Sequence, residues 1–193
     1  MIATIFDYGA GNLHSLAKAV AQPGISVRIE PDPLRAIDTD LLVLPGVGAF
    51  AFAVERLSPA RDAMRRAILD GLPTVGICLG MQLLFDSSEE GPGAGLSVFD
   101  GTVTRLGATR LPHIGWNSLS FESGVEAPPV YYANSYACRP TDESIVVAWT
   151  THENDRFPAI VCRGSTCGLQ FHPEKSSTAG VATLRDLIVE VTS

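Results

Sequence analysis

Short apolar runs that alternate with helix-length stretches are the feature of this sequence that most limits its fold. In the first half of the chain, strands are predicted at 1–6, 26–30, 40–46 and 73–78. Helical spacing of apolar residues occupies the intervals between them, at 12–22, 51–57, 60–71 and 80–88. Strands separated by helices indicate right-handed parallel crossovers. We therefore expect an α/β fold with a doubly wound, mostly parallel central sheet and helices on both faces.

The pattern changes at about residue 98, where short β-rich runs replace the alternation. These runs lie at 98–106, 130–138, 144–150, 159–164 and 166–171, and a helical stretch follows at 179–191. They predict a β-rich C-terminal extension of the sheet. The Gly- and Pro-containing segment 87–97 is expected to be a surface loop. A chain of 193 residues with no repeat and no linker fits one domain, 1–193.

Charge and composition exclude several classes of partner. The net charge is −7 and no cluster of Lys or Arg is present, which argues against nucleic acid and anionic membranes as partners. No apolar stretch approaches the roughly 20 residues of a membrane span. Because the N-terminal residues lack the pattern of a secretory signal, we expect a cytoplasmic protein. In that compartment the cysteines should be free thiols, with Cys138, Cys162 and Cys167 as packing residues.

One cysteine, Cys78, stands in the pattern Gly-x-Cys-x-Gly between a predicted strand and a predicted helix. Glycines on both sides suit a sharp strand-to-helix turn that holds a nucleophile at its tip. The partial positive charge of the helix start would favour a thiolate there. A buried cysteine in a tight turn is the other interpretation of the same pattern.

A second motif, "FHPE", places His172 and Glu174 on either side of Pro173. In an extended chain residues i and i+2 project to the same side, and proline fixes the backbone between them. The pair suits a general base and the carboxylate that orients it. Alone it would more often be an exposed ion pair, but together with Cys78 it completes a nucleophilic triad.

The third motif, "PGVG", ends a predicted strand with small residues. The N–H groups of Val47 and Gly48, with that of Leu79 after the cysteine, could bind an oxyanion. An ordinary strand-to-loop turn explains the motif equally well when it is taken alone. A dinucleotide loop at 9–14 is unlikely, because the G-x-G-x-x-G pattern would need glycine where His14 stands.

Taken together, "GICLGMQLLF", "FHPEKS" and "LPGVGAF" resemble the class I, triad-type glutamine amidotransferases. The stretches "DYGAGNLHSL" and "PHIGWN" narrow the resemblance to the glutaminase subunits of imidazole glycerol phosphate synthase. The motifs follow the family's order from Asp7 to Ser176. The resemblance implies glutamine hydrolysis through a thioester on Cys78, with ammonia passed to a (β/α)8-barrel cyclase subunit in histidine biosynthesis.

The resemblance also implies roles for further residues. Four match positions that hold L-glutamine: Gln82, Glu90, Ser135 and Tyr136. Four match positions near the interface with the cyclase: His113, Trp116, Tyr131 and Lys175. Neither a cofactor nor a metal ion is implied.

One position departs from the family pattern, because Asn134 stands where a histidine usually precedes Ser-Tyr. Any tuning of the site by that histidine is therefore in doubt. Two alternatives remain: an amidotransferase subunit serving another acceptor, such as those of anthranilate or pyridoxal phosphate synthesis, and a catalytically silent binding module on the same fold.

Overall fold

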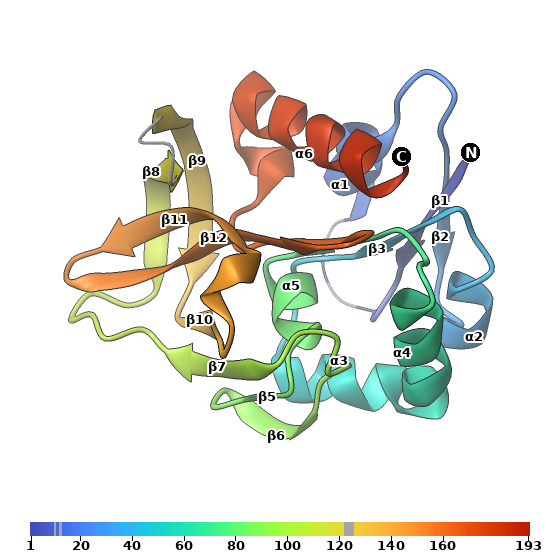
Figure 1. Ribbon diagram of the computed structural model, residues 1–193, viewed down its shortest axis with the longest axis horizontal. Coiled ribbons are helices and arrows are strands. Elements are labelled where there is room, and N and C mark those ends of the chain that lie inside the picture. The colour runs from blue at the N-terminus through green and yellow to red at the C-terminus, as the bar shows by residue number, and fades with distance from the viewer. Residues whose placement is uncertain (10, 12, 122–125) are drawn as a thin grey trace.

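A large mixed sheet forms the centre of the protein. The computed structural model describes residues 1–193 except 10, 12 and 122–125 (Figure 1). Within the described residues the sheet has nine strands in the order β2-β1-β3-β4-β13-β12-β11-β8-β9. The parallel part comprises β2 (Ser26–Glu30), β1 (Ile2–Phe6), β3 (Leu41–Leu44), β4 (Thr74–Ile77) and β13 (Thr166–Leu169). The antiparallel part adds β12 (Asp155–Arg163), β11 (Val146–His152), β8 (His113–Phe121) and β9 (Glu126–Asn134).

Helices cover both faces of this sheet, as the alternating pattern predicted. On one face lie α1 (Leu13–Val20) and α6 (Ser177–Val191). On the other lie α3 (Phe50–Leu57), α4 (Arg61–Leu69) and α5 (Leu79–Leu83) (Figure 1). The doubly wound fold and its β-rich extension are confirmed. No helix in the described part of the chain is long and apolar enough to cross a membrane.

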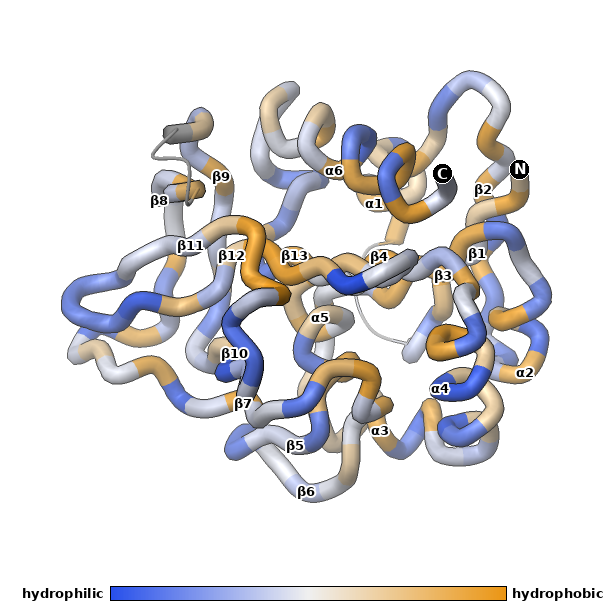
Figure 2. The backbone as a smooth tube through the Cα atoms, viewed as in Figure 1, coloured by the Kyte–Doolittle hydropathy of each residue, from blue (hydrophilic) through white to orange (hydrophobic). Residues whose placement is uncertain are grey.

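The two faces of the parallel strands belong to separate apolar cores. In β3, Leu41 and Val43 pack into the core beneath α1 and α6. Leu42 and Leu44 pack into the core beneath α3, α4 and α5. Alternate residues of a strand point to opposite faces, so a strand covered on both sides must be apolar throughout. Figure 2 shows the resulting concentration of hydrophobic residues along the central strands.

A second, four-stranded sheet lies beside α5 and α3, on the lower side of the central sheet in Figure 1. Its order is β10 (Tyr136–Pro140), β7 (Gly101–Arg105), β5 (Ser87–Ser88) and β6 (Gly91–Ala94). The segment 87–97, expected as a loop, therefore contains two short strands. Its Gly- and Pro-rich sequence has no strand propensity, and β5 forms because β7 offers it a parallel partner.

Several other elements were not predicted, among them one short helix, β8 and one of the 3₁₀ turns. Helix α2 (Pro33–Ala36) is too short to show periodicity, although Asp32 caps it by accepting from the N–H groups of Leu34 and Arg35. Strand β8 carries Ile114 and Trp116 on its exposed face and Gly115 and Asn117 on the other, so it lacks the alternation of apolar and polar residues that predicts a strand. The 3₁₀ turn Pro173–Lys175, here η3, follows β13.

The expectation of free thiols is wrong for Cys162 and Cys167, which form a disulfide. The two residues face each other across β12 and β13, with their Cα atoms 4.2 Å apart. The strands are joined by the two-residue turn Gly164-Ser165, and this turn sets the register that opposes the cysteines. The expectation rested on a reducing compartment and did not consider pairing across a hairpin. Cys78 and Cys138 are free and buried.

Candidate active site

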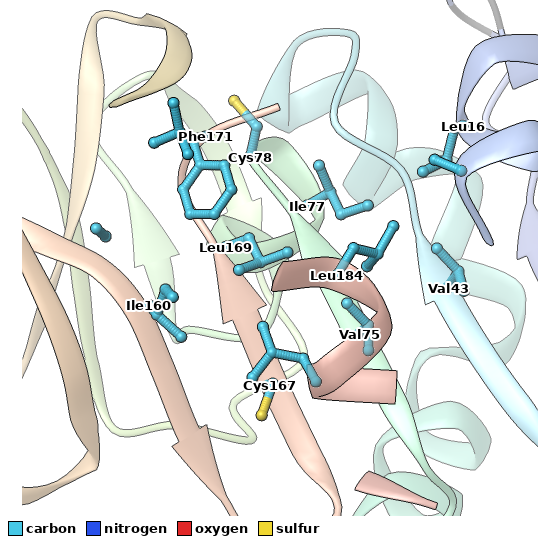
Figure 3. Packing of buried hydrophobic residues seen from close by; sticks show 14 of the residues in the cluster. Leu16, Val43, Val75, Ile77, Cys78, Ile160, Cys167, Leu169, Phe171 and Leu184 are labelled. Carbon is cyan, nitrogen blue, oxygen red and sulfur yellow. The ribbon is translucent and has the colours of Figure 1, made fainter. Parts of the chain in front are cut away.

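Cys78 lies at the carboxyl end of β4, where open α/β sheets collect ligands. It immediately precedes α5, and its backbone has φ of 48° and ψ of −103°. Its N–H donates to the carbonyl of Leu169 at 2.6 Å, which fixes it to the neighbouring strand β13. Figure 3 shows its sulfur directed away from the core side chains of Ile77 and Leu169. A non-glycine residue with positive φ is strained, and such strain is typical of a nucleophile held at a strand-to-helix turn.

The glycines around Cys78 are required by close packing. A Cβ at Gly80 would lie 2.0 Å from the Leu44 carbonyl oxygen, and one at Gly76 would lie 2.6 Å from that of Gly80. Both contacts involve backbone atoms, which cannot move aside. Helix α5 therefore approaches β3 and β4 only because these positions carry no side chain. The close packing explains why both glycines of the Gly-x-Cys-x-Gly pattern are needed at this strand-to-helix turn.

His172 and Glu174 come from the segment that follows β13, the strand beside Cys78. Nδ1 of His172 lies 2.9 Å from Oε1 of Glu174, and the two side chains are 3% and 9% exposed. The His172 backbone is fixed as well: its N–H donates to the Tyr131 carbonyl, and its carbonyl accepts from the Ser176 hydroxyl at 2.6 Å. The hydroxyl oxygen of Ser176 in turn accepts from the N–H of Tyr131. The predicted pair is therefore a buried, rigid one.

The Cys78 sulfur changes the proton affinity of His172. Burial disfavours the charged imidazole and lowers its pKa, but attraction to the Cys78 sulfur, a hydrogen bond to it and the Glu174 carboxylate together raise the pKa to about 10. The favourable interactions outweigh the burial. The imidazole thus keeps a second proton at neutral pH, Glu174 holds one ring N–H, and the other faces the sulfur.

A cavity of about 200 Å³ opens beside the Cys78 sulfur. The oxyanion and glutamine-site residues predicted from the sequence line it, except Val47: Gly48, Leu79, Gln82, Glu90, Ser135 and Tyr136. The structure brings these positions together from α5, β5–β6 and the β9–β10 connection. Gly46, Pro112, Ala133 and Asn134 complete the lining.

The oxyanion-loop glycines fit closely against neighbouring residues. A Cβ at Gly46 would lie 3.1 Å from both Cβ of Cys78 and Cε1 of His172. Gly48 has φ of 118°, which favours glycine. The Val47 side chain packs on Gly11, where a Cβ would come within 2.0 Å of Cγ2. Gly11 belongs to the loop that was considered for a dinucleotide, and its lack of a side chain leaves space for Val47. Its neighbours Ala10 and Asn12 lie outside the described residues.

The predicted glutamine-site residues are held by hydrogen bonds to the protein. Oε2 of Glu90 accepts from the N–H of Phe50 at 2.9 Å, at the start of α3. A helix start stabilises a carboxylate there. Gln82 is 5% exposed and donates to the carbonyl of Tyr136 at 3.2 Å. That carbonyl also accepts from Nδ2 of Asn134 at 3.1 Å, so both of its lone pairs are used within the protein.

The residues predicted at a partner interface come from β8, β9 and η3. Trp116 is 55% exposed and makes an edge contact with Tyr131, and Lys175 is exposed. His113 is instead buried: its ring stacks on Tyr132 and on His152, 4.9 and 4.1 Å between centroids. His113 and Trp116 line a second cavity of about 390 Å³ beside the first.

Asn134 directly opposes His113 in the pairing of β9 with β8. Burial and the charge of His152 lower the pKa of His113 to about 4, and the neighbouring Asn134 side chain works in the opposite direction. The His113 ring is therefore neutral at physiological pH. The position that departs from the family pattern is thus a buried polar contact between the two cavities.

Sequence reasoning missed two residues that touch the reacting groups. Gly46 packs against both Cys78 and His172. Gln170, fully buried, donates from Nε2 to Sγ of Cys78 at 3.5 Å. A signal for Gln170 was its position two residues before His172, just after the end of β13.

Known proteins share both the sequence and the fold. Residues 4–191 match the family model of glutamine amidotransferase class-I. The imidazole glycerol phosphate synthase subunit HisH of Pyrococcus furiosus is 42% identical over 94% of this chain and 95% of its own length. That of Geobacillus thermodenitrificans is 41% identical, covering 97% and 95%. A crystal structure of a glutamine amidotransferase superposes with a TM-score of 0.79 at 18% identity over 100% and 99%. The chain therefore belongs to the class I glutamine amidotransferases, within the family of HisH subunits.

Proposed function

We propose that this chain hydrolyses the side-chain amide of L-glutamine, with Cys78 as nucleophile. The observation that carries the proposal is the position of a strained, buried Cys78 beside the ion pair of His172 and Glu174, at the mouth of a cavity. A thiol, a base and a carboxylate that orients the base are the parts that acyl transfer needs. The carboxylate fixes the ring and stabilises its charge.

The reaction proceeds in two halves. Sγ of Cys78 attacks the amide carbon while His172 provides the proton that the departing ammonia needs. A carbon–sulfur bond forms and the carbon–nitrogen bond breaks, which leaves a γ-glutamyl thioester. His172, now neutral, takes a proton from water as the water attacks the thioester; the carbon–sulfur bond breaks, glutamate leaves, and the Cys78 thiolate and the charged imidazole are restored.

The negative oxygen that forms in each half requires N–H donors. The N–H of Leu79, at the start of α5, has no partner within the helix because the first N–H groups of any helix lack one. A second donor would come from Val47 or Gly48. Loss of one such donor typically costs about 3–4 kcal/mol of transition-state stabilisation.

Recognition of glutamine would fall to the far wall of the cavity. The Glu90 carboxylate suits the α-ammonium group, because opposite charges in a confined site form strong hydrogen bonds. Gln82, one turn along α5, would contact the same end of the substrate. Since both carbonyl lone pairs of Tyr136 are already used, contacts from Ser135 and Tyr136 would come from other main-chain groups.

Ammonia released into water would be protonated and lost as a nucleophile, so it must reach a second active site. We assign that site to a (β/α)8-barrel cyclase subunit of imidazole glycerol phosphate synthase, in cytoplasmic histidine biosynthesis. The exposed Trp116 and Ile114 of β8 supply an apolar anchor for such a partner. His113, Tyr131 and Lys175 lie around it.

Glutaminase assays with and without the barrel subunit test the proposal. Glutamate formation that rises with the barrel, together with glutamine-dependent synthesis of imidazole glycerol phosphate, supports it. Activity that responds only to another acceptor enzyme would assign the chain to a different amidotransferase. A protein that stays inert under every condition, although folded, would be a binding module.

A further inference from the structure

Gln170 occupies the space directly behind the nucleophile and has no role in the mechanism above. Its side chain is 0% exposed and lies between β13 and the turn that carries His172. Its N–H donates to the Ala159 carbonyl at 2.9 Å, which ties this position to β12. Its side-chain Nε2 lies 3.5 Å from Sγ of Cys78, a normal distance for a hydrogen bond to sulfur.

A second hydrogen bond fixes the direction in which the Gln170 amide points. Nε2 of Gln82 lies 3.5 Å from Oε1 of Gln170 and 3.2 Å from the Tyr136 carbonyl. An amide has a donor end and an acceptor end, and Gln82 needs an acceptor. The oxygen of Gln170 therefore faces Gln82, and its N–H faces the sulfur. A flipped amide would place two donors against each other and an oxygen against Sγ.

We propose that Gln170 is a further catalytic residue of this site, whose amide N–H stabilises the Cys78 thiolate and directs the sulfur toward the cavity. The proposal rests on Cys78 being the nucleophile. A hydrogen bond to sulfur is stronger when sulfur is charged, so the contact favours the reactive form. Together with His172, the amide gives the thiolate two donors from the short segment that follows β13.

The link through Gln82 extends this role to the substrate pocket. Gln82 lines the cavity and holds the amide of Gln170, so a residue proposed to contact glutamine also orients the group behind the nucleophile. Replacing Gln82 with a residue that has no donor should therefore release the Gln170 amide. A residue that merely contacted the substrate would leave the free thiol unaffected.

Alkylation of Cys78 by iodoacetamide as a function of pH tests the proposal without substrate. Gln170→Met keeps the volume and removes the donor, and Gln170→Glu keeps the shape and adds an acceptor. Thr166→Val is the matched control, because Thr166 is buried at the other end of β13, where it pairs with Thr74 at the start of β4 and not with the end that carries Cys78. The Cys78→Ala variant gives the background rate.

We expect the midpoint of the alkylation profile to move up by about one pH unit in Gln170→Met, with a roughly tenfold slower rate at neutral pH. Gln170→Glu should shift it further and Gln82→Met in the same direction, while Thr166→Val keeps the wild-type midpoint. A folded Gln170→Met variant with a wild-type profile would overturn the proposal.

A measurement on the unaltered protein decides the matter if these variants do not fold. The side-chain amide signals of Gln170, followed by ¹⁵N NMR, should move with the same midpoint as the alkylation, and no such movement should occur in Cys78→Ser. Signals that stay constant through that midpoint would refute the contact. Failure of the proposed function gives a different result: the unmodified complex would then show no glutaminase activity, or fully alkylated protein would keep it.

Discussion

The Gly46→Ala substitution tests the geometry of the nucleophile and its base with a single methyl group. Gly46 has no positive φ, so alanine can adopt its backbone conformation without strain. The added Cβ would lie 3.1 Å from Cβ of Cys78, 3.1 Å from Cε1 of His172 and 2.9 Å from the Ile77 carbonyl oxygen. The methyl group would therefore press on both members of the catalytic pair at once.

The size of the effect follows from these distances. Carbon atoms in contact prefer separations of about 3.5–4.0 Å, so each group must move by about 0.4 Å or more. A misplacement of about 1 Å can cost roughly 100-fold in rate, and two smaller displacements in opposite directions should lower kcat by roughly 10- to 100-fold. Overpacking of this kind typically costs about 1–3 kcal/mol of stability. For a chain of this size, each kcal/mol lowers the Tm by about 2–4 °C.

Steady-state glutaminase kinetics of the complex measure the prediction, with Tm determined in parallel. The KM for glutamine should change less than kcat, because Gln82 and Glu90 lie away from the methyl group. Gly107→Ala is the matched control: its added Cβ would have its nearest contact at 3.7 Å, with Asp155, and its activity should equal that of the wild type. If folded Gly46→Ala kept kcat within twofold of the wild type, the reasoning from packing would be refuted.

Four further outcomes are expected. Cys78→Ala should lose on the order of 10⁶ in glutamine-dependent turnover while synthesis with added ammonia continues, and near-normal glutaminase activity would remove Cys78 from the mechanism. In Cys78→Ser the pKa of His172, followed by NMR, should fall well below 10, because burial lowers it and the sulfur that raised it is gone; a value that stays near 10 would contradict this. Gln82→Ala and Glu90→Ala should each raise the KM for glutamine more than they lower kcat, and a pure kcat defect would place them in the chemistry instead. Val47→Gly should raise the basal glutaminase activity of the complex without acceptor substrate, since a β-branched residue resists the backbone change that aligns an oxyanion donor; unchanged basal activity would exclude this role.

Local sequence patterns predicted the parallel strands of the sheet and the catalytic motifs. The run Leu41–Leu44 is apolar at every position because alternate side chains enter two cores. The glycines around Cys78 could be interpreted from the sequence because only glycine fits where α5 approaches β3 and β4. His172 and Glu174 do meet, but not on an extended segment as predicted: Glu174 lies in the 3₁₀ turn Pro173–Lys175, and this turn brings its carboxylate to Nδ1 of His172.

The remaining features depend on contacts between distant segments. Strands β5 and β6 form in a Gly- and Pro-rich segment because β7 pairs with it. His113, expected at an interface, is buried because Tyr132 and His152 stack on its two sides. The Cys162–Cys167 bond depends on the register of the hairpin that β12 and β13 form.

The sequence by itself determined where a thiol, an imidazole and a carboxylate could be held, because backbone constraints at Gly76, Gly80 and Pro173 act over a few residues. Only the tertiary structure decided what surrounds them. Gln170 reaches the Cys78 sulfur across 92 positions of sequence, and the Glu90 carboxylate reaches the start of α3 across 40. Such contacts form when β13 pairs with β4 and when the second sheet folds against α3, and no local propensity specifies either event.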